Sequence, residues 1–171
     1  MSASVRVATV TVSDTRTADS DEGGARLRER LEAAGLVVGP HAIVRDEPGE
    51  IRAVIARICD GDLADVIVTT GGTGIAGRDR TYEAIEALLE KRLDGFGEAF
   101  RRLSWDEIGP RAVLFRAVAG VHRNRLVAAL PGSPNAVVLG VDRVLAPMVG
   151  HAVALLRGDR PGHGGRPEPQ R

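Results

Sequence analysis

The stretch VIVTTGGTGIAGRDRT (residues 66–81) passes from a short β-branched run through a glycine-rich loop into the start of a helical pattern. Val66 to Val68, continuing into Thr69, is typical of a buried strand. A helix that begins after Asp79 would bury Ile85, Leu88 and Leu89. A strand, a loop and a helix in succession are the repeating unit of α/β folds. We therefore expect the loop at the carboxyl end of a strand, where such folds bind ligands.

The same alternation continues on both sides of this stretch. The other predicted strands are Val5–Val12, Leu36–Val44, Val113–Val121 and Arg125–Leu130, and helical patterns cover Gly24–Ala34, Ile51–Cys59, Val137–Leu145 and Met148–Leu155. Residues 113–130 form a β-hairpin in this prediction, and Pro147 separates the last two helices. The sequence thus predicts an α/β fold, a three-layer sandwich with a mostly parallel central sheet, helices on both faces and one β-hairpin.

The length and composition favour one compact domain. The chain has 171 residues, of which 43% are hydrophobic, enough for a substantial core. We expect a domain over residues 4–157 and a disordered tail over 158–171, where Gly, Pro and Arg dominate. Cys59 is the one cysteine, so no intrachain disulfide can form, and the amino terminus lacks the pattern of a signal peptide. These features predict a cytoplasmic protein.

The composition argues against two classes of partner. Lys and Arg together number 23, as do Asp and Glu, so no net field attracts nucleic acid. Aromatic residues make up 3% of the chain, too few for base stacking along a single strand. No stretch approaches the ~20 apolar residues that a membrane span requires. We expect neither a nucleic acid nor a membrane as partner.

The glycine loop matches two phosphate-binding motifs in part. Gly72 to Gly77 spells G-x-G-x-x-G, the dinucleotide fingerprint. That motif also needs an acidic residue ~20 positions onward at the end of a strand, and Lys91–Gly97 does not have a strand pattern. The outer glycines have the spacing of a P-loop, but Arg78 and Asp79 replace its lysine and hydroxyl residue. We reject both motifs.

The glycines still favour a ligand-binding loop. Gly71, Gly72 and Gly74 can adopt positive φ and let a ligand approach the backbone, and successive N–H groups near a helix start attract an anion. A second loop, Leu130–Asn135 (LPGSPN), also ends a predicted strand and opens a helix, with Ser133 as N-cap. The alternatives are a purely structural tight turn for the first loop and a well-made helix start for the second.

Three carboxylates narrow the chemistry. Asp14 and Asp46 each follow a predicted strand, and Asp79 comes directly after the glycine loop, so all three are expected at the ligand-binding edge of the sheet. Carboxylates beside a phosphate repel it unless a hard cation such as Mg²⁺ lies between them. Each carboxylate alone could instead be a helix cap. Together they predict Mg²⁺-dependent handling of a polyphosphate.

The remaining candidates for chemistry are weaker. The histidines lack metal-ligand spacing and have the pattern of surface residues; they are His41, His122, His151 and His163. Cys59 falls on the apolar stripe of its helix, which indicates a core residue and not a nucleophile. Four arginines near the loops and in the following segment could meet phosphates or form a solvated face; they are Arg78, Arg80, Arg101 and Arg102.

Three segments together resemble the MoaB/MogA family of molybdenum cofactor biosynthesis proteins. These are ATVTVSD (residues 8–14), VTTGGTGIAGRDRT (68–81) and LPGSPNAV (130–137), and the resemblance covers roughly residues 4–157. It implies a three-layer α/β fold with a pocket for molybdopterin. Active members of the family use Mg-ATP to adenylylate the phosphate of molybdopterin, releasing pyrophosphate.

The resemblance also assigns roles to residues of this sequence. Asp46 and Asp79 match the family's functional aspartates, which implies that they are catalytic and hold Mg²⁺. The residues it implies for binding substrate and phosphate are Ser13, Asp14, Thr70, Gly71, Gly72, Thr73, Gly74, Arg78, Pro131, Gly132 and Ser133. One departure is Gly23, at a position where relatives often carry a serine.

The segment DGFGEAFRRLSWDEIG (residues 94–109) resembles the MoaB branch more than the MogA branch. The resemblance leaves two main functions open. The first is an enzyme, a molybdopterin adenylyltransferase that uses ATP and Mg²⁺. The second is a non-catalytic protein that binds and carries molybdopterin, and a more distant third is a scaffold for other cofactor-biosynthesis proteins. A homo-oligomer, trimer or hexamer, is implied as well.

Overall fold

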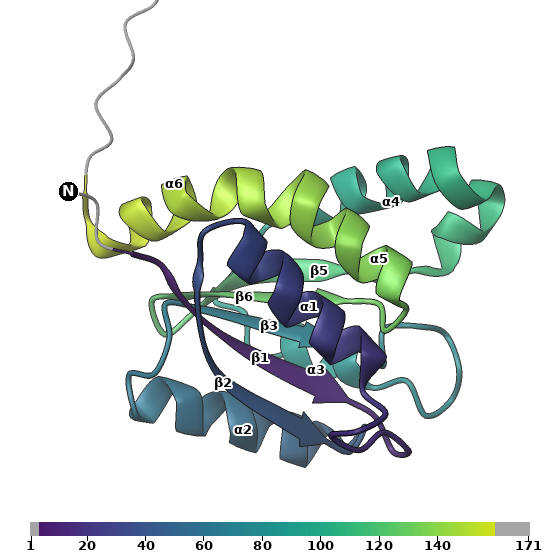
Figure 1. The fold of residues 1–171 in the computed structure, drawn as a ribbon, viewed down its shortest axis with the longest axis horizontal. Coiled ribbons are helices and arrows are strands. Elements are labelled where there is room, and N and C mark those ends of the chain that lie inside the picture. Colours follow the sequence, from purple (N-terminus) through teal and green to yellow (C-terminus); the bar gives the residue numbers. More distant parts are fainter. Residues whose placement is uncertain (1–3, 160–171) are drawn as a thin grey trace, which may run out of the picture.

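The computed structural model, which describes residues 4–159, contains a six-stranded sheet between two layers of helices, as predicted (Figure 1). The strands are β1 (Arg6–Val12), β2 (Val37–Val44), β3 (Val66–Thr70), β4 (Lys91–Arg92), β5 (Val118–His122) and β6 (Arg125–Leu130). The α-helices are α1 (Glu22–Ala33), α2 (Pro48–Asp60), α3 (Thr81–Glu86), α4 (Asp94–Ile108), α5 (Pro134–Leu139) and α6 (Ala146–Arg157). A 3₁₀ helix, η1 (Gly109–Leu114), and a π-helical segment, η2 (Gly140–Leu145), complete the elements.

The sheet is mostly parallel. Its strand order is β2-β1-β3-β6-β5-β4. Strands β1, β2, β3 and β6 run parallel, whereas β5 is antiparallel to β6 and to β4. In β1 every residue from Val7 to Val12 is buried, because helices cover the central strands on both faces. This explains why the strand pattern in the sequence is apolar on both alternating faces.

Two separate groups of apolar side chains form the core. On one face of the sheet, α1, α4, α5 and α6 bury residues such as Leu27 and Phe100 (Figure 1). On the other face, α2 and α3 bury the stripe predicted from helical spacing and also Ile85; the stripe is Ile51, Val54, Ile55, Ile58 and Cys59. Leu88 and Leu89, predicted to be buried by the same helix, lie beyond the end of α3 and are partly buried.

The connections create an open crevice at one edge of the sheet. Neighbouring strands β1 and β3 run parallel, but the chain leaves β1 for α1 on one face and leaves β3 for α3 on the other. The two connections therefore diverge beyond the carboxyl ends of these strands. Such a switch point is where open α/β sheets bind ligands. The residues that follow Val12 and Thr70 form the walls of this crevice.

In the second half of the chain, several strands and helices begin or end at other residues than predicted. The hairpin is present, but β5 begins at Val118 and not at Val113. Val113 and Leu114 lie in η1 and are 64% and 46% exposed, so the apolar run that the sequence assigns to one strand is divided between a surface turn and the strand. Lys91 and Arg92, predicted not to form a strand, pair with β5 as the two-residue β4. Asp94 then begins α4, so the dinucleotide motif is still incomplete.

The prediction that Pro147 separates two helices is wrong. The chain is helical from Pro134 to Arg157 without a break. Ahead of the proline the helix widens into η2, where the N–H of Ala146 donates to the carbonyl of Val141, five residues back. Proline lacks an N–H and clashes with the preceding turn of a regular α-helix, and a π-helical turn relieves both problems.

This continuous helix, Pro134–Arg157, has 24 residues and is apolar enough to cross a membrane by length and composition. That differs from the expectation that no segment approaches a membrane span. Half of its most apolar window is buried inside the protein, where residues such as Val137, Val141 and Leu145 pack in the core beside the sheet. A helix that is buried in the core of a protein can have the same length and apolar composition as a membrane span. The fold therefore explains the composition of this helix. Of the tail predicted as disordered, 158–171, residues 160–171 lie outside the described residues. Gly158 caps α6 in a left-handed conformation, and the Asp159 N–H donates to the Ala154 carbonyl at 2.9 Å.

We expect Phe100→Ala to destabilise the fold by about 3–5 kcal/mol, because Phe100 is fully buried and its removal leaves a cavity between α4 and the sheet. Asp106→Ala, on the exposed side of α4, is the control and should change the free energy of unfolding by less than about 0.5 kcal/mol. Urea unfolding measures both values. Equal effects would show that α4 does not pack as described.

Candidate functional site

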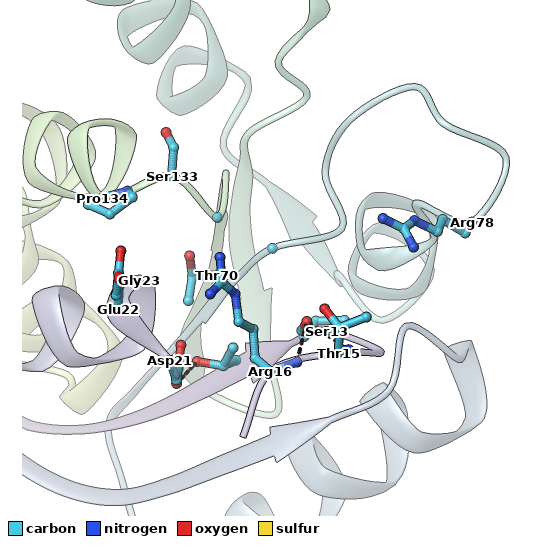
Figure 2. Close-up of a pocket in the computed structure, with 14 residues that line it drawn as sticks. Ser13, Thr15, Arg16, Asp21, Glu22, Gly23, Thr70, Arg78, Ser133 and Pro134 are labelled. Carbon is cyan, nitrogen blue, oxygen red and sulfur yellow. Dashed lines mark hydrogen bonds between the residues drawn. The ribbon is translucent and has the colours of Figure 1, made fainter. Parts of the chain in front are cut away.

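A pocket of about 460 Å³ occupies the crevice beyond β1 and β3 (Figure 2). Its walls come from four parts of the chain: the end of β1 and the loop after it, the start of α1, the end of β3 with the glycine loop, and the loop after β6. Figure 2 shows Arg78 on the opposite side of the pocket from Glu22 and Gly23. The pocket therefore combines residues from both halves of the sequence.

The glycine loop can exist only with glycine at its tightest positions. Gly71 and Gly72 have φ values of +99° and +65°, the left-handed region that other residues rarely adopt. A side chain at Gly72 would collide with the Thr81 hydroxyl and with the carboxylate of Asp46. A side chain at Gly74 would approach the carboxylate of Asp79 to 2.6 Å. The glycines therefore let the backbone lie directly against the two predicted catalytic carboxylates.

The second loop is joined to the first. The Thr70 hydroxyl donates to the Pro131 carbonyl at 3.0 Å, and the Gly71 N–H donates to the Leu130 carbonyl at 3.0 Å. Ser133 is the N-cap of α5, as predicted, and accepts from the Ala136 N–H. These bonds hold the carboxyl ends of β3 and β6 together, so the two loops form one wall of the pocket.

Gly23, at the start of α1, lies against this wall. A Cβ at position 23 would be 2.6 Å from the Gly132 carbonyl oxygen. The start of α1 therefore approaches the second loop more closely than a residue with a side chain would allow.

The three predicted carboxylates gather at the ligand-binding edge. The Asp46 N–H donates to the Asp14 carboxylate at 3.0 Å, and the Asp46 carboxylate accepts the Arg80 N–H at 3.0 Å. Burial raises the pKa of Asp46, an effect opposed by the Arg80 N–H and reinforced by the negative charges of Asp79 and Asp14. The Thr81 hydroxyl is buried near Asp46 but forms no hydrogen bond of acceptable geometry. None of the three carboxylates forms an ion pair within the described residues, although the charge of Arg45 reaches Asp14.

The donor set fits a hard divalent cation. Asp79 accepts the Ala76 N–H with one carboxylate oxygen, and Asp46 accepts the Arg80 N–H with one of its own. Each carboxylate keeps a second oxygen, and oxygen ligands are what Mg²⁺ prefers. No group of three or more His, Cys, Asp or Glu residues that could hold a metal occurs within residues 4–159. A cation here would therefore need further oxygens from a bound phosphate or from water, as is common for Mg²⁺.

The predicted residues fall into two neighbouring parts of the site. Those that line the pocket are Ser13, Thr70, Gly71, Arg78, Gly132 and Ser133. Those that do not line it are Asp14, Gly72, Thr73, Gly74, Pro131, Asp46 and Asp79. The glycine loop connects the two parts, since it begins at the pocket and continues to the carboxylates. The carboxylates thus lie beside the pocket and not on its walls.

Several residues of the pocket were not predicted from the sequence. Arg16 extends into it from the loop after β1 (Figure 2) and donates to the Ser20 carbonyl at 2.9 Å. Asp21 is 6% exposed and accepts from the Thr11 hydroxyl at 2.6 Å and from the Gly24 N–H at 2.8 Å. As N-cap of α1, Asp21 could have been found from its place before a helical pattern. Nothing in the sequence singles out Arg16.

His41 is not the surface residue that the sequence predicted. Its ring lies between the Thr9 hydroxyl, at 2.8 Å, and the Asp21 carboxylate, at 3.1 Å. Burial lowers the pKa of His41, and the charge of Arg28 adds to this effect, while Asp21 opposes it. His122 is also mostly covered and contacts the Leu88 carbonyl, whereas His163 lies outside the described residues. The β1–β2 pairing shifts between Val7 and Thr9, which brings Thr9 opposite His41.

The crevice, the glycine loop and the carboxylates define an α/β protein with a candidate ligand-binding site at the switch point of its sheet. Comparison with known proteins agrees with this class. The model of the family described as "Probable molybdopterin binding domain" matches residues 8–151. The chain belongs to this family, the MoaB/MogA family of molybdenum cofactor biosynthesis proteins.

Individual relatives are similar along nearly their whole length. Molybdenum cofactor biosynthesis protein B of Staphylococcus aureus (strain COL) is 45% identical over 152 residues, which cover 87% of this chain and 90% of the relative. The protein of the same name from Halalkalibacterium halodurans is 45% identical over 157 residues, 91% of this chain and 92% of the relative. A crystal structure of a molybdenum cofactor biosynthesis protein B superposes with a TM-score of 0.89 at 40% identity, covering 92% and 99% of the two chains.

Replacing Asp46 by Asn should stabilise the protein at pH 7 without added metal. The folded-state pKa of Asp46 lies above its unfolded value, so the ionised carboxylate destabilises the fold, and an amide removes that charge. We expect a Tm gain of about 2 °C that is complete above the folded-state pKa and disappears as the pH falls through that pKa toward the unfolded value. Thermal denaturation across a pH series measures it.

Asp106→Asn, which removes an exposed carboxylate on α4, is the matched control and should show no gain. A lower Tm for Asp46→Asn at pH 7 would contradict the description of Asp46 as a destabilised carboxylate.

Proposed function

We propose that this protein is a molybdopterin adenylyltransferase that joins the phosphate of molybdopterin to AMP from Mg-ATP. The observation that carries the proposal is the glycine loop, which links a pocket to a group of close carboxylates that form no ion pair within residues 4–159. A site for two phosphate-bearing ligands needs both backbone donors and a bridging cation. The membership of the family supports molybdopterin as one ligand.

The reaction is a nucleotidyl transfer. An oxygen of the molybdopterin phosphate attacks the α-phosphorus of ATP, a new phosphorus–oxygen bond forms, and the bond to the β-phosphate breaks, so that pyrophosphate leaves. The protein contributes positioning and charge stabilisation. The pocket holds the molybdopterin through its backbone groups and the side chains of Ser13, Thr70, Arg78 and Ser133. The adjoining glycine loop, Gly71 to Gly74, orients phosphate oxygens.

Mg²⁺ would be held by Asp46 and Asp79, whose free carboxylate oxygens fit a hard cation. When bound, the cation supplies charge neutralisation for the phosphates of ATP. Asp14 supports this arrangement by accepting the Asp46 N–H. We propose a cytoplasmic location and a homo-oligomer, trimer or hexamer, in keeping with the family resemblance.

One observation favours a second function. Asp46 and Asp79 do not line the pocket, so the pocket could hold molybdopterin without using the carboxylates. In that case the protein would bind and carry molybdopterin within the pathway without chemistry. The two functions differ in whether ATP is cleaved.

Pyrophosphate release from Mg-ATP, with and without molybdopterin, separates them. We expect release that requires molybdopterin in the native protein and falls at least about a hundredfold in Asp79→Asn, the loss typical for one group that stabilises charge in the transition state. Asp106→Asn is the control and should retain full activity.

Binding of molybdopterin without release of pyrophosphate would show that the protein is a carrier. Full activity of a folded Asp79→Asn variant would remove Asp79 from the catalytic site.

A further inference from the structure

Arg116, between η1 and β5, binds the glycine loop from a distant part of the chain. Its main-chain N–H donates to the Thr73 carbonyl at 3.3 Å. Its guanidinium donates to the Gly74 carbonyl twice, from Nε at 3.0 Å and from Nη2 at 2.6 Å. Two successive carbonyls of the loop are therefore occupied by one residue. A planar guanidinium suits this forked contact because its donors are fixed in direction.

These contacts determine where the N–H groups of the loop point. In a trans peptide, the carbonyl and the N–H of the next residue face opposite ways. The carbonyls of Gly72, Thr73 and Gly74 are occupied by the Thr81 N–H and by Arg116. The N–H groups of Thr73, Gly74 and Ile75 must then face away from these partners, and none of them has a hydrogen-bond partner within residues 4–159. Three successive free donors are suited to an anion.

Arg116 is itself held by the helix that follows the loop. Its guanidinium pairs with Glu83 and lies 5.0 Å from the centroid of the Tyr82 ring, both on α3. The Arg116 side chain is 28% exposed and that of Glu83 is 53% exposed, so this is a surface ion pair whose own contribution to stability is small. Arg116 thus connects the turn of the glycine loop to the first turn of α3. The loop is fixed at both ends and in the middle.

We propose that Arg116 is a positioning residue that fixes the peptide orientation of residues 72–75 and so keeps their N–H groups directed toward a bound phosphate. The inference rests on the proposed function of the loop as a phosphate site. Arg116 touches loop carbonyls and α3, and the phosphate would contact the N–H groups on the other side of the loop. Its effect on binding is therefore transmitted through the backbone.

Arg116→Met and Arg116→Lys test the inference. The first removes the donors, and the second keeps the charge near Glu83 but loses the fork. We expect both to increase hydrogen–deuterium exchange of the amides of residues 73–75 and to weaken binding of Mg-ATP about tenfold, the effect of losing a hydrogen bond with a charged partner. Calorimetric titration with Mg-ATP measures the affinity, and KM for ATP should rise more than kcat falls.

Two further variants make the result specific. Arg111→Met, on the exposed side of η1, is the matched control and should leave loop exchange and affinity unchanged. Glu83→Gln keeps Arg116 but removes its ion-pair partner. We expect a smaller increase in amide exchange and a smaller loss of Mg-ATP affinity than in Arg116→Met. This variant keeps the inference testable if Arg116→Met does not fold.

The outcomes separate this inference from the proposed function. Faster exchange with weaker Mg-ATP binding supports the role of Arg116, even if the native protein releases no pyrophosphate. Unchanged exchange, unchanged affinity or full rescue by Arg116→Lys would overturn it, even if the native protein is an active adenylyltransferase.

Discussion

The site depends on the way the chain leaves two neighbouring parallel strands. Strand β1 continues to a helix on one face of the sheet and β3 to a helix on the other, so the edge between them stays open. No helix can cover this edge without reversing one of the connections. The backbone that emerges from both strands must therefore satisfy its own hydrogen bonds or offer them to a ligand. The pocket, the glycine loop and the carboxylates all follow from this opening.

The buried carboxylate at this edge has no ion-pair partner within the described residues. At the opposite edge of the sheet, Asp65 is paired with arginines, whereas Asp46 is buried beside two other carboxylates and accepts a backbone N–H. Proteins keep such unbalanced groups where a ligand completes them. A cation with its phosphates would balance the charge, which is why we propose that the carboxylates and the free amides of the glycine loop form one site.

Much of the fold was predictable because its cause is local. The buried run of β1, the stripe of α2 and the strand–loop–helix order around residues 66–81 come from hydrophobic spacing and glycine positions. The errors arose where packing outweighs local preference. Val113 and Leu114 form a surface turn in spite of their apolar side chains, and Pro147 stays inside a helix because the π-helical turn before it accommodates the ring.

The sequence by itself determined the α/β class, the family and the presence of Asp14, Asp46 and Asp79 at one edge of the sheet, since each of these depends on short motifs and on strand direction. Only the tertiary structure decided which groups meet. Arg16 and Arg116 reach the site from segments whose patterns do not point to it, and Arg116 lies more than thirty residues from the loop that it holds. The physical reason is that a side chain's partners are fixed by how distant elements pack, and spacing along the chain does not record that packing.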